Sequence, residues 1–430
     1  MLDSGETDAG RPRALAGRRP WLVITAFLGI LALFAAGCSG VGARPVAQAK
    51  AQRAASAARL TITPASGMRN ARPGEGVTVA ASHGSVKNVT VTSGRDPVSG
   101  YLNATRTVWH SRWALQPSHG YTVTATAVDP SGRALTRTSS FRTLTPSATF
   151  QAQIFEGYRQ TYGVGMPIIL TFSHPVTDRM TVERSLQLWT SKPVTGAWYW
   201  DGSQSLVFRP RTYWPQNTDV SFAAHLDGVE AAPGVYGVAN LTQSFRIGES
   251  LIAVVSTTSH DATIYFRGKL LGVWPASTGS PGDDTANGTY LTIEKANPVL
   301  MSGPGYTDFP VPYSVRFTFS GDYMHDAYWS VGEQGYANVS HGCVNLSPAH
   351  AEVYYNLAVP GDPVIIKGSP VAGAWDDGWT EWFLTWTQLL RGSATHEAVQ
   401  AGPSGSSFVN PATVATPPLG APHPGNYHGP

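Results

Sequence analysis

A short stretch of the chain combines the side chains that acyl transfer through a cysteine requires. It reads Ser340-His341-Gly342-Cys343-Val344-Asn345-Leu346-Ser347-Pro348. A thiol attacks a carbonyl carbon only as the thiolate, and a free cysteine has a pKa of about 8.5, so Cys343 needs a neighbouring base. His341 and His325, which lies eighteen residues before Cys343, are the two candidates.

The spacing of these residues indicates how they can meet. His341 lies two residues from Cys343, and alternate residues of a strand share one face. The longer separation of His325 allows a strand, a turn and a returning strand, so that the imidazole can face the sulfur. The amides of Gly342 and Cys343 are candidate oxyanion donors, because a glycine lets the backbone approach a substrate closely.

A zinc site is an alternative interpretation of the same side chains. Cys343, His325, His341 and His350 offer three nitrogen ligands and one sulfur ligand. However, a His-X-Cys pair is more closely spaced than the ligands of structural zinc sites, and His350 falls in an expected helix. We therefore favour acyl transfer, with chance packing of the cluster as the other alternative.

Regular elements are expected on both sides of this stretch. Ser347 as N-cap and Pro348 at the first helical position predict a helix that continues over Ala349–Leu357. The apolar run Val364–Ile366 predicts a closing strand.

Two earlier segments have the pattern of antiparallel sheets. From about 60 to 145, Tyr121, Val123 and Ala125 alternate with threonines, and from 146 to 249, Trp198–Ser203 and Leu206–Phe208 indicate a hairpin. Each segment has about 100 residues and lacks a helical period, which is typical of an immunoglobulin-type β-sandwich. Neither contains cysteine, so no intersheet disulfide is expected.

Composition supports a mainly β protein with several domains. The 430 residues predict roughly three domains, and 45 Gly with 32 Pro favour short strands joined by turns. A net charge of +2 is too small to drive binding to nucleic acid, so no nucleic-acid partner is expected.

The C-terminal region consists of a Trp-rich segment followed by a segment rich in Pro and Gly. Trp379, Trp382, Trp386 and Leu389 recur at helical spacing, which predicts a short helix that packs its aromatic face on a neighbouring domain. Residues 392–430 are rich in Pro and Gly, which predicts a disordered tail.

The N-terminus has the features of an export signal. Basic residues precede the uncharged run Trp21–Ala36, which is short for a spanning helix but suits a signal peptide. The run ends in Ala35-Ala36-Gly37-Cys38-Ser39, which resembles a bacterial lipobox. We expect lipid on Cys38 and an extracytoplasmic lipoprotein anchored at the outer face of the plasma membrane; an ordinary cleaved signal and an uncleaved anchor are the alternatives.

The stretch around Cys343 resembles the His…Ser-His-Gly-Cys-X-Asn signature of L,D-transpeptidases of the YkuD type. Trp329–Gly335 resembles the segment between the family's histidine and cysteine. Thr285–Tyr290 resembles its Thr-Pro-X-Gly turn, with Ala286 where Pro is commoner. The lipobox, the two sandwiches and the Trp-rich end resemble the mycobacterial type of this family.

The resemblance implies roles for individual residues. Cys343 would be the nucleophile and His325 the general base. Supporting positions of the pocket and oxyanion hole would be Ser340, His341, Gly342 and Asn345, and substrate-binding positions would be Met301, Tyr306, Ser320 and Gly321. Asp326 follows the base where relatives often carry Ser; a backbone carbonyl is expected to orient the imidazole, and the Asp326 carboxylate is expected to face solvent.

The resemblance also implies the reaction and the division of the chain. The enzyme would release D-Ala from a tetrapeptide stem and form 3→3 peptidoglycan cross-links between donor and acceptor stems, with no metal or cofactor, and carbapenem-type β-lactams would acylate Cys343. An L,D-carboxypeptidase and a non-catalytic wall-binding lipoprotein remain alternatives. The expected parts are a signal peptide with lipobox (1–37), a flexible linker (38–59), two immunoglobulin-like domains that space the active site from the membrane (60–145 and 146–249), a catalytic domain (250–368), a Trp-rich helical subdomain (369–391) and a disordered tail (392–430).

Overall fold

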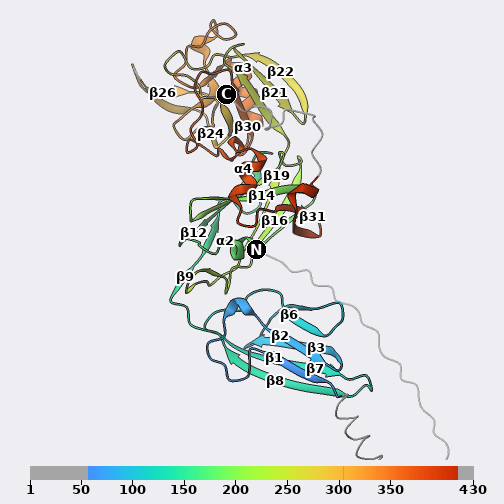
Figure 1. Cartoon of the computed structure of the whole chain (residues 1–430). Coiled ribbons are helices and arrows are strands. Elements are labelled where there is room, and N and C mark those ends of the chain that lie inside the picture. Colours follow the sequence, from blue (N-terminus) through green and yellow to red (C-terminus); the bar gives the residue numbers. More distant parts are fainter. Residues whose placement is uncertain (1–56, 304, 415–430) are drawn as a thin grey trace, which may run out of the picture. The chain divides into compact units, whose positions relative to one another are not determined.

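The computed structural model describes residues 57–303 and 305–414. The expected signal peptide with Cys38, nearly all of the expected linker and residues 415–430 lie outside this range. The described chain is mainly β, as the sequence predicts (Figure 1). No helix among the described residues is long and apolar enough to span a bilayer.

The first sandwich consists of two four-stranded antiparallel sheets. One sheet contains β1 (Arg59–Thr63), β2 (Thr78–Ser82), β6 (Val108–Ser111) and β5 (Gly100–Leu102), and the other contains β4 (Asp96–Pro97), β3 (Ser85–Ser93), β7 (Gly120–Val128) and β8 (Ala134–Arg142). Tyr121, Val123 and Ala125 alternate inward on β7 as predicted, and they pack against Trp109 and Phe141 in the core between the sheets.

The second sandwich is built around the predicted hairpin of β14 (Val194–Asp201) and β15 (Ser205–Pro210), in which Trp198 pairs with Phe208. Its six-stranded sheet also contains β10 (Ala152–Ile154), β12 (Ile168–Phe172), β31 (Ala398–Gly402) and β32 (Gly405–Val409). The facing sheet contains β11 (Thr161–Tyr162), β19 (Leu241–Ile247), β16 (Thr218–Ala224) and β13 (Leu186–Thr190). Helix α2 (Arg179–Arg184) and a small sheet of β9 (Ala148–Phe150), β17 (Glu230–Ala232) and β18 (Val235–Gly237) complete it.

The third unit packs two sheets around a helix. Its first sheet has the order β22 (Lys269–Pro275), β21 (Asp261–Phe266), β20 (Leu251–Ser256), β30 (Pro363–Lys367) and β23 (Gly288–Leu291). Its second sheet has the order β24 (Glu294–Ala296), β27 (Ser314–Arg316), β28 (Tyr323–Asp326) and β29 (Val344–Leu346). Helix α3 (Pro348–Leu357) begins where predicted, with the Ser347 side chain accepting a hydrogen bond from the His350 amide.

Every residue of β20 is buried, because both faces of its sheet are covered. Leu251, Ala253 and Val255 point into the core of the third unit. Ile252 and Val254 belong to the core of the second sandwich. The second sandwich and the third unit therefore share an apolar boundary.

The Trp-rich segment differs from the single helix that its spacing predicts. A 3-10 helix (Glu381–Phe383) is followed by extended backbone at Leu384 and then by α4 (Trp386–Gly392). The chain breaks there because Thr385 forms a capping box with Gln388 and so starts a new helix. The predicted aromatic packing is nevertheless present, since Trp382 is buried and its Nε1 donates to the Gly165 carbonyl at 2.7 Å.

The predicted disorder from residue 392 is wrong for the part that the structure describes. Strands β31 and β32 form a hairpin, and β31 pairs with β14 of the second sandwich (Figure 1). Gly402-Pro403-Ser404-Gly405 forms the turn of this hairpin, so the Gly and Pro content marks a turn rather than disorder. The buried Ala398, Val399 and Ala401 supply the apolar contacts.

Candidate active site

Parallel strands β28 and β29 place the predicted histidine beside the residues that follow the predicted cysteine. Met324 pairs with Val344, and His325 pairs with Asn345. Met324 and Val344 point into the core, so the alternation of a strand places His325 and Asn345 on the opposite face. The expected returning strand is thus parallel to the first, and residues 327–343 cross between them through a 3-10 helix (Tyr328–Ser330).

Cys343 lies in a bend immediately before β29, so it does not share a strand face with His341 as the spacing suggested. The side chain of His341 is exposed, and its ring centroid lies 6.0 Å from that of Tyr306. Gly342 has a φ of +116°, a conformation that side chains rarely adopt, which explains the glycine before the cysteine.

The sulfur of Cys343 is held against the start of β28. The thiol contacts the carbonyl oxygen of Gly321 at 3.9 Å. Burial, followed by the charge of Asp322, raises the pKa of the Cys343 thiol to about 12, and the backbone amide of Tyr323 acts in the opposite direction. The cysteine is therefore a neutral thiol at rest.

His325 is oriented by a backbone carbonyl. It is 4% exposed, and its Nδ1 lies 2.8 Å from the carbonyl oxygen of Asp326. A carbonyl can only accept, so Nδ1 carries the hydrogen and the lone pair of the neutral ring lies on Nε2. Burial lowers the pKa of His325 to about 4, so the imidazole is a neutral potential base at pH 7.

The Asp326 carboxylate does not face solvent, contrary to the expectation. The residue is 5% exposed, and Oδ1 has no hydrogen-bond partner among the described residues. Burial raises the pKa of this carboxyl. The sequence could not reveal this, because the side chain turns inward only once β28 is placed over the core.

The predicted supporting residues fix the bend rather than contact the sulfur. Ser340 Oγ donates to the Cys343 carbonyl at 2.6 Å and accepts from the Gly342 amide at 3.3 Å. Asn345 Nδ2 donates to Ser330 Oγ at 3.0 Å and so ties β29 to the crossover. Because the Gly342 amide is engaged, the Cys343 amide is the better candidate for an oxyanion donor.

A hairpin of β25 (Val299–Gly303) and β26 (Tyr306–Val311) carries Met301 and Tyr306, two of the expected substrate-binding residues. Met301 pairs with Phe309, whose ring lies 5.1 Å from that of Trp329. The pKa of Tyr306 is raised by burial and then by the charge of Cys343. Trp329 in turn stacks on His325 with 5.8 Å between ring centroids.

Two acidic residues of the site were missed in the sequence. Asp377 accepts hydrogen bonds from the Ser320 amide at 2.6 Å and from Ser320 Oγ at 2.7 Å. Asp322 is partly buried beside Cys343. The available signal was that Asp322 lies three residues before His325; for Asp377, only the fold of the C-terminal segment brings it to this loop.

The zinc interpretation finds no geometric support. Among residues 57–303 and 305–414, no group of three or more His, Cys, Asp or Glu is placed to hold a metal ion. His350 instead stacks on Trp274, with ring centroids 4.7 Å apart and planes 4° apart.

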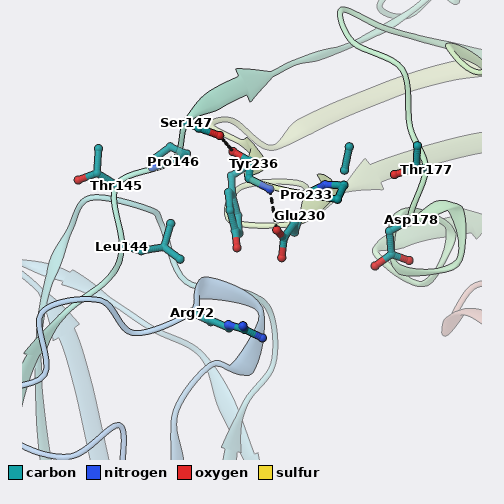
Figure 2. A pocket seen from close by; sticks show the side chains of 12 residues that line it. Arg72, Leu144, Thr145, Pro146, Ser147, Thr177, Asp178, Glu230, Pro233 and Tyr236 are labelled. Atoms are coloured by element: carbon teal, nitrogen blue, oxygen red, sulfur yellow. Dashed lines mark hydrogen bonds between the residues drawn. The ribbon is translucent and has the colours of Figure 1, made fainter.

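A separate cavity of about 790 Å³ lies away from these residues (Figure 2). It is lined by side chains of both sandwiches, among them Arg72, Asp178, Glu230 and Tyr236. It contains neither a thiol nor an imidazole, so the chemistry places the active site at Cys343 rather than in this cavity.

Comparisons with known proteins agree with this location. The YkuD model, an L,D-transpeptidase catalytic domain, matches residues 250–366, and the Big_10 model, a bacterial Ig domain, matches residues 68–230. L,D-transpeptidase 5 of Mycobacterium tuberculosis is 33% identical over 352 residues, which is 79% of this chain and 77% of the relative. The solved structure of LD transpeptidase LdtMt1 in complex with imipenem is 37% identical in sequence to this chain. The match has a TM-score of 0.43 and covers 52% of this chain and 100% of the solved chain.

L,D-transpeptidase 2 of M. tuberculosis is 30% identical over 407 residues, or 90% of this chain and 97% of the relative. This coverage includes the sandwiches as well as the unit that carries Cys343. The chain belongs to the L,D-transpeptidase family.

Proposed function

We propose that this L,D-transpeptidase forms 3→3 peptidoglycan cross-links through an acyl-enzyme on Cys343. The observation that carries the proposal is a neutral, oriented imidazole on β28 beside the parallel strand β29, which the thiol of Cys343 immediately precedes. A thiol beside a base with a free lone pair can exchange one amide for another through a covalent acyl intermediate.

Acylation begins from a neutral pair. The pKa shifts of Cys343 and His325 both disfavour a preformed thiolate and imidazolium, so the proton moves to Nε2 as the sulfur attacks. The attacked carbonyl belongs to the third residue of the donor stem. When the C–N bond to the terminal D-Ala breaks, His325 returns the proton to the leaving amine.

The thioester then reacts with the side-chain amine of the third residue of an acceptor stem. The new C–N bond forms as the C–S bond breaks, and Cys343 recovers its proton. Tyr306 and Met301 on the β25–β26 hairpin cover the acyl group, which favours the amine by excluding water. With water as acceptor, the same steps give an L,D-carboxypeptidase.

Mass spectrometry and product analysis test the proposal. Imipenem is expected to add one drug mass to the peptide that contains Cys343, and tetrapeptide stems are expected to yield dimers with release of D-Ala. Cys343→Ser should abolish both signals, and His325→Gln should slow both by about 10²- to 10⁴-fold. Tripeptide without dimer would show a carboxypeptidase, and absence of both adduct and product would favour a non-catalytic binding module.

We further propose that lipid on Cys38 anchors the enzyme at the outer face of the plasma membrane, where it meets the cell wall. Support comes from the basic residues before the apolar run and from the small residues before Cys38. Labelled palmitate is expected to mark the full chain in cells, and Cys38→Ser is expected to remove the label. Equal labelling of the two forms would contradict a lipid anchor at this cysteine.

A further inference from the structure

The carboxylate of Asp322 lies beside the catalytic cysteine, and the mechanism above does not use it. A Cβ at position 342 would stand only 2.3 Å from Asp322 Oδ1, so the carboxylate rests directly on Gly342. The next residue is Cys343, and the charge of Asp322 contributes to the raised pKa of its thiol. A carboxylate here opposes formation of a thiolate, so acylation alone gives no reason for it.

The loop that carries Asp322 is held firmly. Thr318 Oγ1 accepts hydrogen bonds from the Gly321 amide at 3.2 Å and from the Asp322 amide at 2.7 Å. Asp377 anchors Ser320 from the other side. The backbone that carries the Asp322 carboxylate is therefore held in place beside Gly342.

No cation of the described chain neutralises this group. Neither Asp322 nor Asp377 takes part in any of the ion pairs found among residues 57–303 and 305–414. Burial and the neighbouring charge of Asp377 raise the pKa of Asp322 to about 6, so the group is mostly ionised at neutral pH. A partly buried carboxylate without a counterion attracts a cation from the substrate.

The reaction supplies such a cation at this place. Attack of the acceptor amine on the thioester is the reverse of the expulsion of D-Ala, with a different amine. The amine that leaves and the amine that attacks therefore occupy the same side of the tetrahedral carbon. Both amines are ammonium ions in water. A carboxylate beside the sulfur can therefore hold the acceptor ammonium next to the thioester carbon.

We propose that Asp322 is the specificity residue that binds the acceptor ammonium and so directs the acyl group to an amine instead of water. This inference rests on the proposed function. The ammonium first gives one proton to His325, and its nitrogen then forms the C–N bond as the C–S bond breaks. The nitrogen loses a second proton to the sulfur, and His325 releases the first to solvent, so the products are an amide, a thiol and one free proton.

Asp322→Asn tests the proposal, because the amide keeps the shape and removes the charge. Asp376→Asn is the matched control, since Asp376 is exposed and adjacent to Asp377. Three rates are measured on each full-length protein: acylation by imipenem, dimer formation from tetrapeptide stems, and cleavage of the acyl-enzyme by hydroxylamine, a nitrogen nucleophile that is largely uncharged at neutral pH.

In Asp322→Asn, acylation by imipenem is expected to rise several-fold, because the variant lacks a charge that opposes the negative charge developing on the sulfur during attack. The rate of dimer formation relative to hydroxylamine cleavage is expected to fall about tenfold or more, which is the usual value of a hydrogen bond to a charged group. Tripeptide should increase at the expense of dimer. Asp376→Asn should resemble the wild type in all three rates.

An unchanged ratio of dimer formation to hydroxylamine cleavage in Asp322→Asn would overturn the inference, as would an equal loss of all three rates in a folded protein. If this variant does not fold, the smaller Asp322→Ser is measured in its place. A different result tests the proposed function: it requires only that the wild-type protein form the Cys343 adduct and the dimer.

Discussion

At the residue scale, the neutral thiol and imidazole distinguish this site from a preformed ion pair. Burial moves the pKa of Cys343 up and that of His325 down, so neither group is charged at rest. The Nδ1 hydrogen bond to the Asp326 carbonyl fixes the ring without a carboxylate partner. The rate of acylation should therefore follow the neutral imidazole and not the thiolate.

The first prediction concerns the pH dependence of acylation by imipenem. His325 is a base only when neutral, and its pKa of about 4 places the acid limb of the profile near that value instead of 6.5. We expect the rate at about pH 5 to be at least equal to that at about pH 7. Stopped-flow fluorescence measures the rate, and the tryptophan emission spectrum verifies that the protein is folded at each pH. A steady loss of rate below pH 6.5 would contradict a buried neutral base.

The second prediction concerns Asp326, whose carboxylate is buried with Oδ1 unpaired. Asp326→Ser should increase the free energy of unfolding at neutral pH by about 1–2 kcal/mol, because a poorly compensated charge is removed. The pKa of Asp326 is raised in the folded state, so the folded protein binds the proton more tightly than the unfolded chain does. The free energy that ionised Asp326 costs the folded state therefore grows as the pH rises above the pKa of this carboxyl in the unfolded chain. In acid, where the carboxyl is protonated in both states, Asp326→Ser should no longer be more stable than the wild type.

Thermal unfolding at several pH values measures this gain, and imipenem acylation measures the activity of the same variant. Activity should persist, since the group that orients His325 is the backbone carbonyl, which serine keeps. A large loss of acylation in a stable Asp326→Ser protein would mean that the carboxylate itself orients the imidazole.

The candidate nucleophile and the candidate base could be read from the sequence, because their types and spacing are local features. The inward turn of Asp326 and the contact between Ser320 and Asp377 could not, because they depend on where β28 and the C-terminal segment lie after folding. The engagement of the Gly342 amide by Ser340 likewise follows from a bend that the motif alone does not specify.

At the element scale, a buried carboxylate adds to the strand pairing and the apolar contacts that attach the C-terminal segment to the second sandwich. Glu183 of α2 accepts from Trp200 Nε1 at 2.8 Å and from the Ala394 amide at 2.7 Å through Oε1. Its Oε2 accepts from Ser393 Oγ at 2.7 Å and from Thr395 Oγ1 at 3.0 Å. This anchor ties the bend between α4 and β31 to α2. Helical spacing could not predict it, because Ser393, Ala394 and Thr395 follow the end of α4.

The third prediction tests this anchor. Glu183→Gln replaces one acceptor oxygen by a donor, so at least one buried donor loses its partner and the free energy of unfolding should fall by about 2 kcal/mol. Glu397→Gln is the control, because Glu397 forms an exposed ion pair with Arg184 and such pairs contribute about 0–1 kcal/mol. Urea unfolding compares the two. Equal stability of these variants would refute the anchoring role of Glu183.

At the scale of the whole molecule, the second sandwich is part of the folding unit of the enzyme and not only a spacer. Ile252, Val254, Leu291, Ile365 and Trp382 all pack in its core. The first sandwich has a core of its own. The sequence suggested two equivalent sandwiches, because each has similar strands and turns. The apolar run of β20, a strand of the third unit, was the sign that both faces of its own sheet are covered.

The fourth prediction follows from this shared core. A chain that starts at residue 146 should fold and react with imipenem like the full protein, because the core of the second sandwich and the catalytic site remain whole. A chain that starts at residue 250 exposes Ile252, Val254, Leu291, Ile365 and Trp382. Burial of each such side chain contributes about 1.5–3 kcal/mol, so their sum is comparable to the free energy of unfolding of a typical domain. This shorter chain should aggregate or show no adduct at Cys343. Size-exclusion chromatography followed by mass spectrometry of the imipenem adduct compares the two, and a soluble, fully acylated chain from residue 250 would restrict the second sandwich to spacing the active site.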